Sequence, residues 1–432
     1  MATRATVERL PYGIGRWSAG WVAVTGLSLA VLALGVFAFA RQLIEGEVVT
    51  GLRNIGTMGG ATWGLYVAFI IYFGGVSFAG ITMVALIRLF NLEQLRPIAR
   101  MSLVLAVISI SLAALSVLVD LGQPFRALIN LPLYGRPMSP FFGTFTVVIS
   151  GYLFASLVYL YLNGRRDAAI CAERSEGAVQ KFYRLWAAGY RDTPAERQRH
   201  QRATYWLAIA ILPLLVAATS TLGFVFGLQV SRPGWYGALQ APGFVILAGV
   251  SGVGHIIVLA AILRRVLGAE DQLNMDVFKW LGNLLMILTV IYLYFWAAEW
   301  LTASYAAHHH EVALSNALLT GEYAWLFWLS VGSLVVPFLL LARQFVTGQY
   351  RLGVMVVSGV LVNLAAIGKR ILIVVPSQTH GTLLPYGTGL YSPTWVEYSV
   401  ILGLLALGAL LLSLFMRVFP IIEIPQYAGG GR

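Results

Sequence analysis

Residues 63–87 read WGLYVAFIIYFGGVSFAGITMVALI, a run without a single charged side chain. A helix of about 20 such residues crosses the ~30 Å hydrocarbon core of a bilayer. Similar stretches recur along the whole 432-residue chain, so we predict an all-α integral membrane protein with ten transmembrane helices. The predicted spans are residues 17–40, 63–87, 101–119, 141–162, 204–226, 241–263, 280–304, 322–342, 352–375 and 395–416.

The composition agrees with this class. Of all residues 59% are apolar and 11% are charged, against roughly 45–50% and 25% in soluble domains. So few charges cannot cover a water-soluble surface, which argues against a cytosolic enzyme, a disordered protein or a nucleic-acid binder. A β-barrel is also disfavoured, because its strands would alternate polar and apolar residues. The single cysteine, Cys171, cannot alone form an internal disulfide or a four-cysteine metal site.

Lysine and arginine indicate the orientation, because loops rich in these residues stay in the cytoplasm. Loops on the side of the N-terminus hold 22 of the 29 basic residues, and the opposite loops hold 5. We therefore predict a multi-pass protein of a prokaryotic inner membrane with both termini in the cytoplasm. Ala38-Phe39-Ala40 resembles a signal-peptidase site, but the apolar core of about 24 residues exceeds the roughly 7–15 of a signal peptide, so we expect an uncleaved anchor.

The chain contains an internal repeat. GGVSFAGITMVALIR (74–88) aligns without gaps with SGVGHIIVLAAILRR (251–265). Four spans separate the two copies, which predicts a parallel repeat about an axis along the membrane normal. We expect two four-helix bundles, from spans 2–5 and 6–9, with the first and last spans peripheral. The units are residues 1–62 (leader, first span and outer loop), 63–226 (first bundle), 227–394 (second bundle) and 395–432 (last span and tail).

One predicted loop is long. Residues 163–203 mix nine basic with five acidic side chains. Within it, the spacing of Val179, Phe182, Leu185 and Trp186 predicts an amphipathic helix over 175–190 that lies on the inner leaflet. A charged linker between the two bundles is the alternative. Cys171 falls in this loop and is expected to be a free thiol.

The histidines argue against haem and against a metal centre. Bis-histidine ligation of haem requires histidines on facing spans, and only His255 falls inside a predicted span. His255 is either a hydrogen-bonded core residue or part of a proton relay. His308-His309-His310-Glu311 suggests a metal site, but adjacent residues on a loop rarely converge on one ion. We therefore expect neither haem nor a metal in this chain.

Asp120 opens the segment DLGQPFR (120–126) at the end of the third span. One interpretation is purely structural: an acid at a helix end, a left-handed cap at Gly122 and Pro124 just beyond. The other is catalytic, because quinol oxidation releases protons together with electrons and a carboxylate at the membrane edge could accept one. Arg126 would then be its ion partner or a docking charge.

Further charges lie at the ends of later spans. An ionisable group within a membrane is costly, so each indicates a functional site by default. Glu299 lies between two tryptophans, Lys369 and Arg370 end the ninth span, and Glu397 opens the tenth. They form either ion pairs and interfacial anchors on the outer side or, together with His255, a proton path.

Aromatic residues line the second span, namely Trp63, Tyr66, Tyr72 and Phe78. Such rings usually pack or anchor a helix, but the flat ring of a quinone needs walls of this kind. With Asp120 and Arg126, three of them, Tyr66, Tyr72 and Phe78, make up the predicted quinone-binding set.

Several segments together resemble the NrfD/PsrC family, the polytopic membrane subunits of respiratory oxidoreductases such as polysulfide reductase and alternative complex III. The ten-span layout is similar to that of the alternative complex III members. The matching stretches are WGLYVAFIIYFGGVSFAGI (63–81), LRPIARM (95–101), VDLGQPFR (119–126), RPMSPFF (136–142), GEYAWLFW (321–328), RILIVVP (370–376) and YSPTWVE (391–397).

The resemblance implies a haem-free subunit that exchanges electrons with a membrane quinone, menaquinone or ubiquinone. It implies a partner iron–sulfur (ferredoxin-like) subunit on the outer face, a molybdopterin-type or multihaem cytochrome subunit, a paralogous NrfD-like subunit in some complexes, and coupling to proton movement in some members. Asp120 falls on the acid that the family places at the quinone site.

The sequence departs from the family at Phe78. Quinol-oxidising members often carry histidine in a Ser-His-Ala-Gly run, whereas this chain has Ser77-Phe78-Ala79-Gly80. Either Tyr66 or Tyr72 replaces the lost imidazole, or this chain is a structural anchor or proton conductor without its own quinone site. A stand-alone secondary transporter is a third alternative, but it would place its charges at the midplane, whereas most charges here lie near span ends.

Overall fold

The computed structural model describes residues 14–15, 18–52, 60–134, 143–306, 308–380 and 389–424, and a long helix lies on each predicted span. The long helices are α1 (Ala19–Glu45), α2 (Leu65–Leu89), α3 (Arg96–Asp120), α5 (Gly143–Glu173), α7 (Pro194–Gly227), α8 (Gln240–Leu267), α9 (Met275–Ala306), α11 (Ala324–Thr347), α12 (Leu352–Val374) and α14 (Trp395–Val418).

In agreement with the predicted class, nine helices of the described chain are long and apolar enough to cross a bilayer. The helix α5 covers the predicted fourth span but is not among the nine, so the count of ten stays a prediction. Several helices, such as α5 and α7, continue past their apolar stretch into charged residues, because charged side chains do not interrupt the backbone hydrogen bonds of a helix.

The predicted loop 163–203 is therefore much shorter than expected. Helix α5 runs on to Glu173 and α7 begins at Pro194, and only the segment between them carries the short helix α6 (Gly177–Ala187). The helix expected over 175–190 is confirmed. Tyr183 and Ala187 on one side of it are buried, while Val179 and Leu185 are exposed. Its contact with the inner leaflet stays a prediction.

Two further short helices were not expected from the sequence. Helix α4 (Pro124–Tyr134) follows α3 almost directly, and α10 (His309–Leu319) connects α9 to α11. The histidines 308–310 therefore lie at the start of a helix, with His308 at its N-cap, and not in a loop as predicted. At 11 residues each, these helices are too short to span and do not resemble spans in the sequence. A single turn, α13 (Pro376–Thr379), extends α12.

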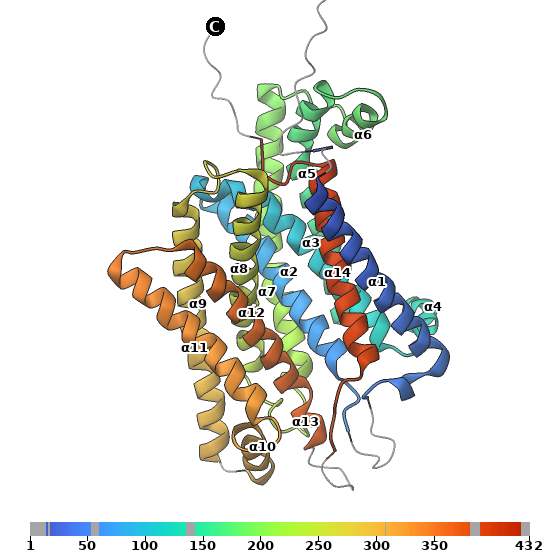
Figure 1. Ribbon diagram of the computed structural model, residues 1–432, viewed down its shortest axis with the longest axis vertical. Coiled ribbons are helices and arrows are strands. Elements are labelled where there is room, and N and C mark those ends of the chain that lie inside the picture. Colours follow the sequence, from blue (N-terminus) through green and yellow to red (C-terminus); the bar gives the residue numbers. More distant parts are fainter. Residues whose placement is uncertain are drawn as a thin grey trace, which may run out of the picture.

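Helix α2 is the centre of the molecule and is buried along most of its length. It packs against the parallel helix α8, its partner in the sequence repeat (Figure 1). A methyl group built on Gly252 would lie 2.1 Å from the Cβ of Ala79, and one on Gly75 would lie 3.4 Å from Ala248. Small residues thus allow the repeat-related helices to approach closely. The division into two four-helix bundles stays a prediction.

The first and last long helices pair with each other. Gly35 of α1 lies against Gly403 of α14, and a methyl group on Gly35 would come within 2.8 Å of the Gly403 Cα. The pair runs along one side of the molecule next to α3, and most of the α1 surface is exposed (Figure 1). In the same view, α6 lies at one end of the molecule, and α10 and α13 lie at the other.

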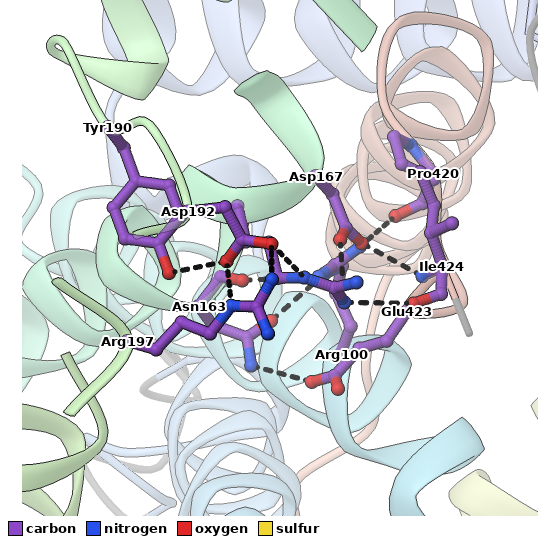
Figure 2. A network of polar contacts seen from close by, with 10 residues as sticks. Arg100, Asn163, Asp167, Tyr190, Asp192, Arg197, Pro420, Glu423 and Ile424 are labelled. Atoms are coloured by element: carbon purple, nitrogen blue, oxygen red, sulfur yellow. Dashed lines mark hydrogen bonds and ion pairs between the residues drawn. The ribbon is translucent and has the colours of Figure 1, made fainter. Parts of the chain in front are cut away.

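A buried ion pair fixes the α6 end of the molecule (Figure 2). Arg100 Nη1 of α3 donates to Asp167 Oδ2 of α5 at 2.6 Å, and both side chains are about 1–2% exposed. Arg100 also donates to the Pro420 carbonyl, and the Ile424 amide donates to Asp167. The C-terminal segment 419–424 is thereby bound to both helices.

A second group of polar side chains continues this network toward α7. Arg197 and the Tyr190 hydroxyl both donate to Asp192 (Figure 2). Partial burial alone would raise the pKa of Asp192, but these hydrogen bonds outweigh it and hold the pKa below its usual range. The segment between α6 and α7 is therefore held by a charged, ordered contact.

Candidate functional site

Asp120 is the last residue of α3, at the end of the molecule opposite α6. Gly122 adopts a positive φ of 59° just beyond it, and α4 begins at Pro124. This left-handed glycine ends α3 in the manner expected from the sequence. The helix end therefore fixes the carboxyl group at the edge of the apolar region.

The carboxyl group of Asp120 is incompletely satisfied. Its Oδ1 atom is buried and has no hydrogen-bond partner in the part of the chain that the structure describes. The carboxylates of Glu47 and Glu397 are near enough to act on it electrostatically. A buried oxygen without a partner is uncommon in folded proteins, and a bound ligand or water molecule would satisfy it.

Tyr66 is connected to this helix end through a buried glutamine. The Tyr66 hydroxyl donates to Gln42 Oε1 at 2.8 Å. Gln42 Nε2 in turn donates to Glu47 Oε1 at 3.0 Å and to the Val119 carbonyl at 3.2 Å. Gln42 and Glu47 were not predicted as site residues, although a glutamine near the end of the first apolar span is a signal that could have identified the site.

Glu397 lies near this group, and its side chain caps the start of α14. It is the third residue of α14 and closes a capping box with Thr394. Its side chain also accepts from the Gly51 amide at 2.6 Å and from the Tyr391 hydroxyl. Burial, together with the Glu397 charge, raises the pKa of Tyr391, so this hydroxyl remains a donor.

The other three residues of the predicted quinone set lie elsewhere. Tyr72 is six residues beyond Tyr66 on α2, about 9 Å along the axis, and donates to Asn363 Oδ1 at 3.0 Å. Phe78 is about 18 Å along the axis from Tyr66 and packs edge-on against Tyr152. Arg126 is exposed on α4, and no ion pair between it and Asp120 is found among the described residues. Only Tyr66 and Asp120 share one site.

The predicted proton-path residues also separate into groups. Lys369 Nζ of α12 donates to Glu299 Oε2 of α9 at 2.6 Å, so Lys369 pairs with Glu299 and not with Glu397. The neighbouring Arg370 is 2% exposed, stacks 4.0 Å from the Phe244 ring centre and leaves Nη1 without a partner within the described chain. His255 packs against Tyr72, also close to Asn363.

The Lys369–Glu299 pair borders a cavity of about 540 Å³ between α9, α10, α11 and α12. Aromatic walls surround its polar groups, and the Lys369 ammonium lies 4.5 Å from the Trp296 ring centre. Trp63, outside this cavity, stacks on Trp235 near the start of α2. Over the described ranges, no three histidine, cysteine, aspartate or glutamate side chains gather in a way that could hold a metal ion.

Comparisons with known proteins give a consistent result. The family model described as "Polysulphide reductase, NrfD" matches residues 53–381. A "Putative dimethyl sulfoxide reductase membrane subunit" of Halobacterium salinarum is 31% identical, over 98% of this chain and 96% of that protein. A selenate reductase subunit of Mesobacillus selenatarsenatis is 27% identical over 91% and 92%. The Hdr-like menaquinol oxidoreductase integral membrane subunit of Archaeoglobus fulgidus is 24% identical over 91% of each chain.

Proposed function

This chain belongs to the NrfD family of polysulphide reductase-type membrane subunits, and from that premise we propose that it links the membrane quinone pool to a respiratory oxidoreductase complex. In this role it exchanges electrons between a quinone and an iron–sulfur subunit bound at the α10 end of the molecule. The names of its relatives, two reductase subunits and a menaquinol oxidoreductase subunit, favour this class over a transporter. A molybdopterin-type or multihaem subunit would complete the complex.

The buried, unpartnered Oδ1 of Asp120 is the observation that carries this proposal. A quinone supplies the two-electron chemistry, and each oxidised quinol must also lose two protons. A carboxylate at the apolar edge can accept a proton from a ring hydroxyl and return it in the reverse direction. The hydrogen bonds of Gln42 with Tyr66 and with Glu47 order the side chains around Asp120, and we call this group of residues the Asp120 corner. Glu47 offers the proton a route toward the surface.

The distribution of basic residues supports an orientation with both termini and α6 in the cytoplasm of a prokaryotic inner membrane. Asp120 and the partner subunit would then face the outer side. Proton coupling, if this chain performs it, would use the polar groups along α12. Asn363 lies close to His255, and it is about 9 Å along the α12 axis from Lys369. Lys369 is paired with Glu299, and Arg370 follows it in the chain.

The first prediction tests Asp120 directly. In the purified complex, Asp120→Asn keeps the shape of the side chain but removes the proton acceptor. Turnover driven by quinol should fall by roughly 10²-fold or more, which is the usual contribution of a general base. Turnover driven by a dye that reduces the partner subunit directly should stay unchanged. Asp271→Asn, an exposed acid in the segment between α8 and α9, is the matched control.

Full quinol-dependent turnover of Asp120→Asn would remove Asp120 from the mechanism. It would favour the second candidate function, a structural anchor or proton conductor without its own quinone site. The position of Phe78 supports that alternative, because this side chain is buried against Tyr152 and has no hydrogen-bonding group to offer a quinone.

A further inference from the structure

The cavity beside Lys369 and Glu299 lies apart from the Asp120 corner and needs its own explanation. It is bordered by the segment before α8 and by α9 to α13. Its volume of about 540 Å³ lies within the ~300–1,000 Å³ of small-molecule sites. Most of the lining is apolar, and Trp296, Trp300 and Phe327 provide flat walls.

Two of the polar groups that line the cavity are strongly buried. Lys369 is 7% exposed and Ser377 is 1% exposed. The Ser377 Oγ atom has no hydrogen-bond partner in the described chain, although it lines the cavity. The Lys369 ammonium, the Glu299 carboxylate and the unpartnered Ser377 hydroxyl therefore offer both donors and an acceptor to a ligand.

The charges of the lining restrict the ligand to a neutral one. An anion such as a phosphate headgroup would meet two carboxylates, Glu299 and Glu311. Opposite them are His308 and one lysine that is already paired with Glu299. A cation would compete for the aromatic face that the Lys369 ammonium already occupies at Trp296. A flat, neutral ring that carries oxygen atoms can pair with Lys369, Ser377 and Glu299 together, because its oxygens can accept from Lys369 and Ser377, and its hydroxyls can donate to Glu299.

We infer that this cavity binds the ring of a quinone or quinol as a second site, separate from the Asp120 corner. The inference rests on the proposed function, which supplies the quinone as ligand. Binding here is reversible and involves hydrogen bonds and ring packing only. Lys369 and Ser377 hold a ring oxygen, Glu299 accepts from a ring hydroxyl when the ligand is reduced, and the tryptophans enclose the ring.

A thiol placed in the cavity gives a direct test, because Cys171 is the only native cysteine of the chain and is buried. In the whole complex in lipid nanodiscs, with Cys171→Ser as background, Ser315→Cys introduces a thiol in the cavity lining. Asn316→Cys places a thiol on the next residue of α10, which is exposed and outside the lining. Alkylation by a maleimide is followed by mass spectrometry of the α10 peptide.

The probe is a decyl-substituted benzoquinone whose ring has no free position for attack by a thiol. We expect it to slow alkylation of Ser315→Cys by about fivefold or more at saturation and to leave Asn316→Cys unchanged, as expected for a ligand that buries most of its surface in a pocket. Decylbenzene, which lacks the ring oxygens, should protect weakly. Ser377→Ala should raise the quinone concentration for half-protection about tenfold, the equivalent of one lost hydrogen bond.

Two outcomes would overturn the second site: no protection by the quinone, or equal protection by decylbenzene, which would mark a merely lipid-filled cavity. Quinol-driven turnover of the same preparation separates this failure from failure of the proposed function. Turnover without protection rejects the second site alone, whereas absence of any quinol-driven turnover in the unmodified complex rejects the proposed function.

Discussion

Asp120 and Lys369 both lie near the end of an apolar helix, but their surroundings differ. Lys369 has a carboxylate partner at 2.6 Å and an aromatic face, whereas one oxygen of Asp120 has no partner among the described residues. An ion pair that is satisfied on several sides contributes to stability, even where it also borders a cavity as this pair does. An acid without a hydrogen-bond partner contributes little to stability and is better explained by a role in proton transfer. For this reason the proposed proton acceptor is Asp120.

The Lys369–Glu299 pair leads to a prediction at this scale. Lys369→Met should destabilise the subunit by about 1–3 kcal/mol, because the Glu299 carboxyl group would lose its partner in a mostly buried position. The double variant Lys369→Met with Glu299→Leu should recover most of the loss, since no lone charge remains. The apparent melting temperature of the purified complex measures both. Equal losses in the single and double variants would contradict this account.

At the scale of the helix, close approach depends on residues that lack a side chain. Gly252→Ala should place a methyl group 2.1 Å from the Cβ of Ala79 and push α8 away from α2. We expect a loss of roughly 1–3 kcal/mol, as for other overpacked cores, seen as a lower apparent melting temperature. Gly243→Ala on the same helix meets nothing within 4 Å and is the control. Adding Ala79→Gly should restore the apparent melting temperature, because it removes the Cβ that the new methyl group would meet. Failure of this rescue would argue against the contact.

The elements that could be predicted from the sequence are those whose signal is local. A run such as 63–87 contains its own evidence for a membrane helix, because hydrocarbon thickness sets the required length. Helices α4 and α10 carry no such signal, because 11 residues are too few to span a bilayer. Helix α10 packs against α9 and α11, whereas the described side chains of α4 are mostly exposed. The end of α3 also has a local signal, the segment DLGQPF, and it could be predicted. The hydrogen bond between Tyr66 and Gln42 could not, because it depends on how α2 and α1 are rotated against each other.

Pairing between distant residues was the hardest feature to predict. Glu299 and Lys369 were both singled out as charges near span ends, but 70 residues separate them, and Glu397 was an equally reasonable partner for Lys369. The choice follows from the packing of α9 and α12, which the sequence of either helix alone does not contain. Residue type thus predicted the candidates, and tertiary structure decided between them.

At the scale of the whole molecule, the Arg100–Asp167 pair joins three distant parts of the chain. Asp167→Ala should leave a guanidinium that is 1% exposed without its counter-charge, at a cost of about 3–5 kcal/mol. Because the Ile424 amide also binds Asp167, the C-terminal segment 419–424 should become sensitive to proteolysis. Asp276→Ala, which removes only an exposed pair with Lys279, is the control. Unchanged melting temperature and proteolysis would show that the pair is dispensable.

The contact of Gly35 with Gly403 has a consequence for biogenesis. The ribosome makes α1 first and α14 last, so the two faces that meet are synthesised 368 residues apart. At ~5–20 residues per second, α1 waits for its partner on the order of 20–70 s. During this interval the nascent helix is surrounded by lipid or by an insertion factor. Its small-residue groove is then open to capture by any other newly inserted helix of similar shape.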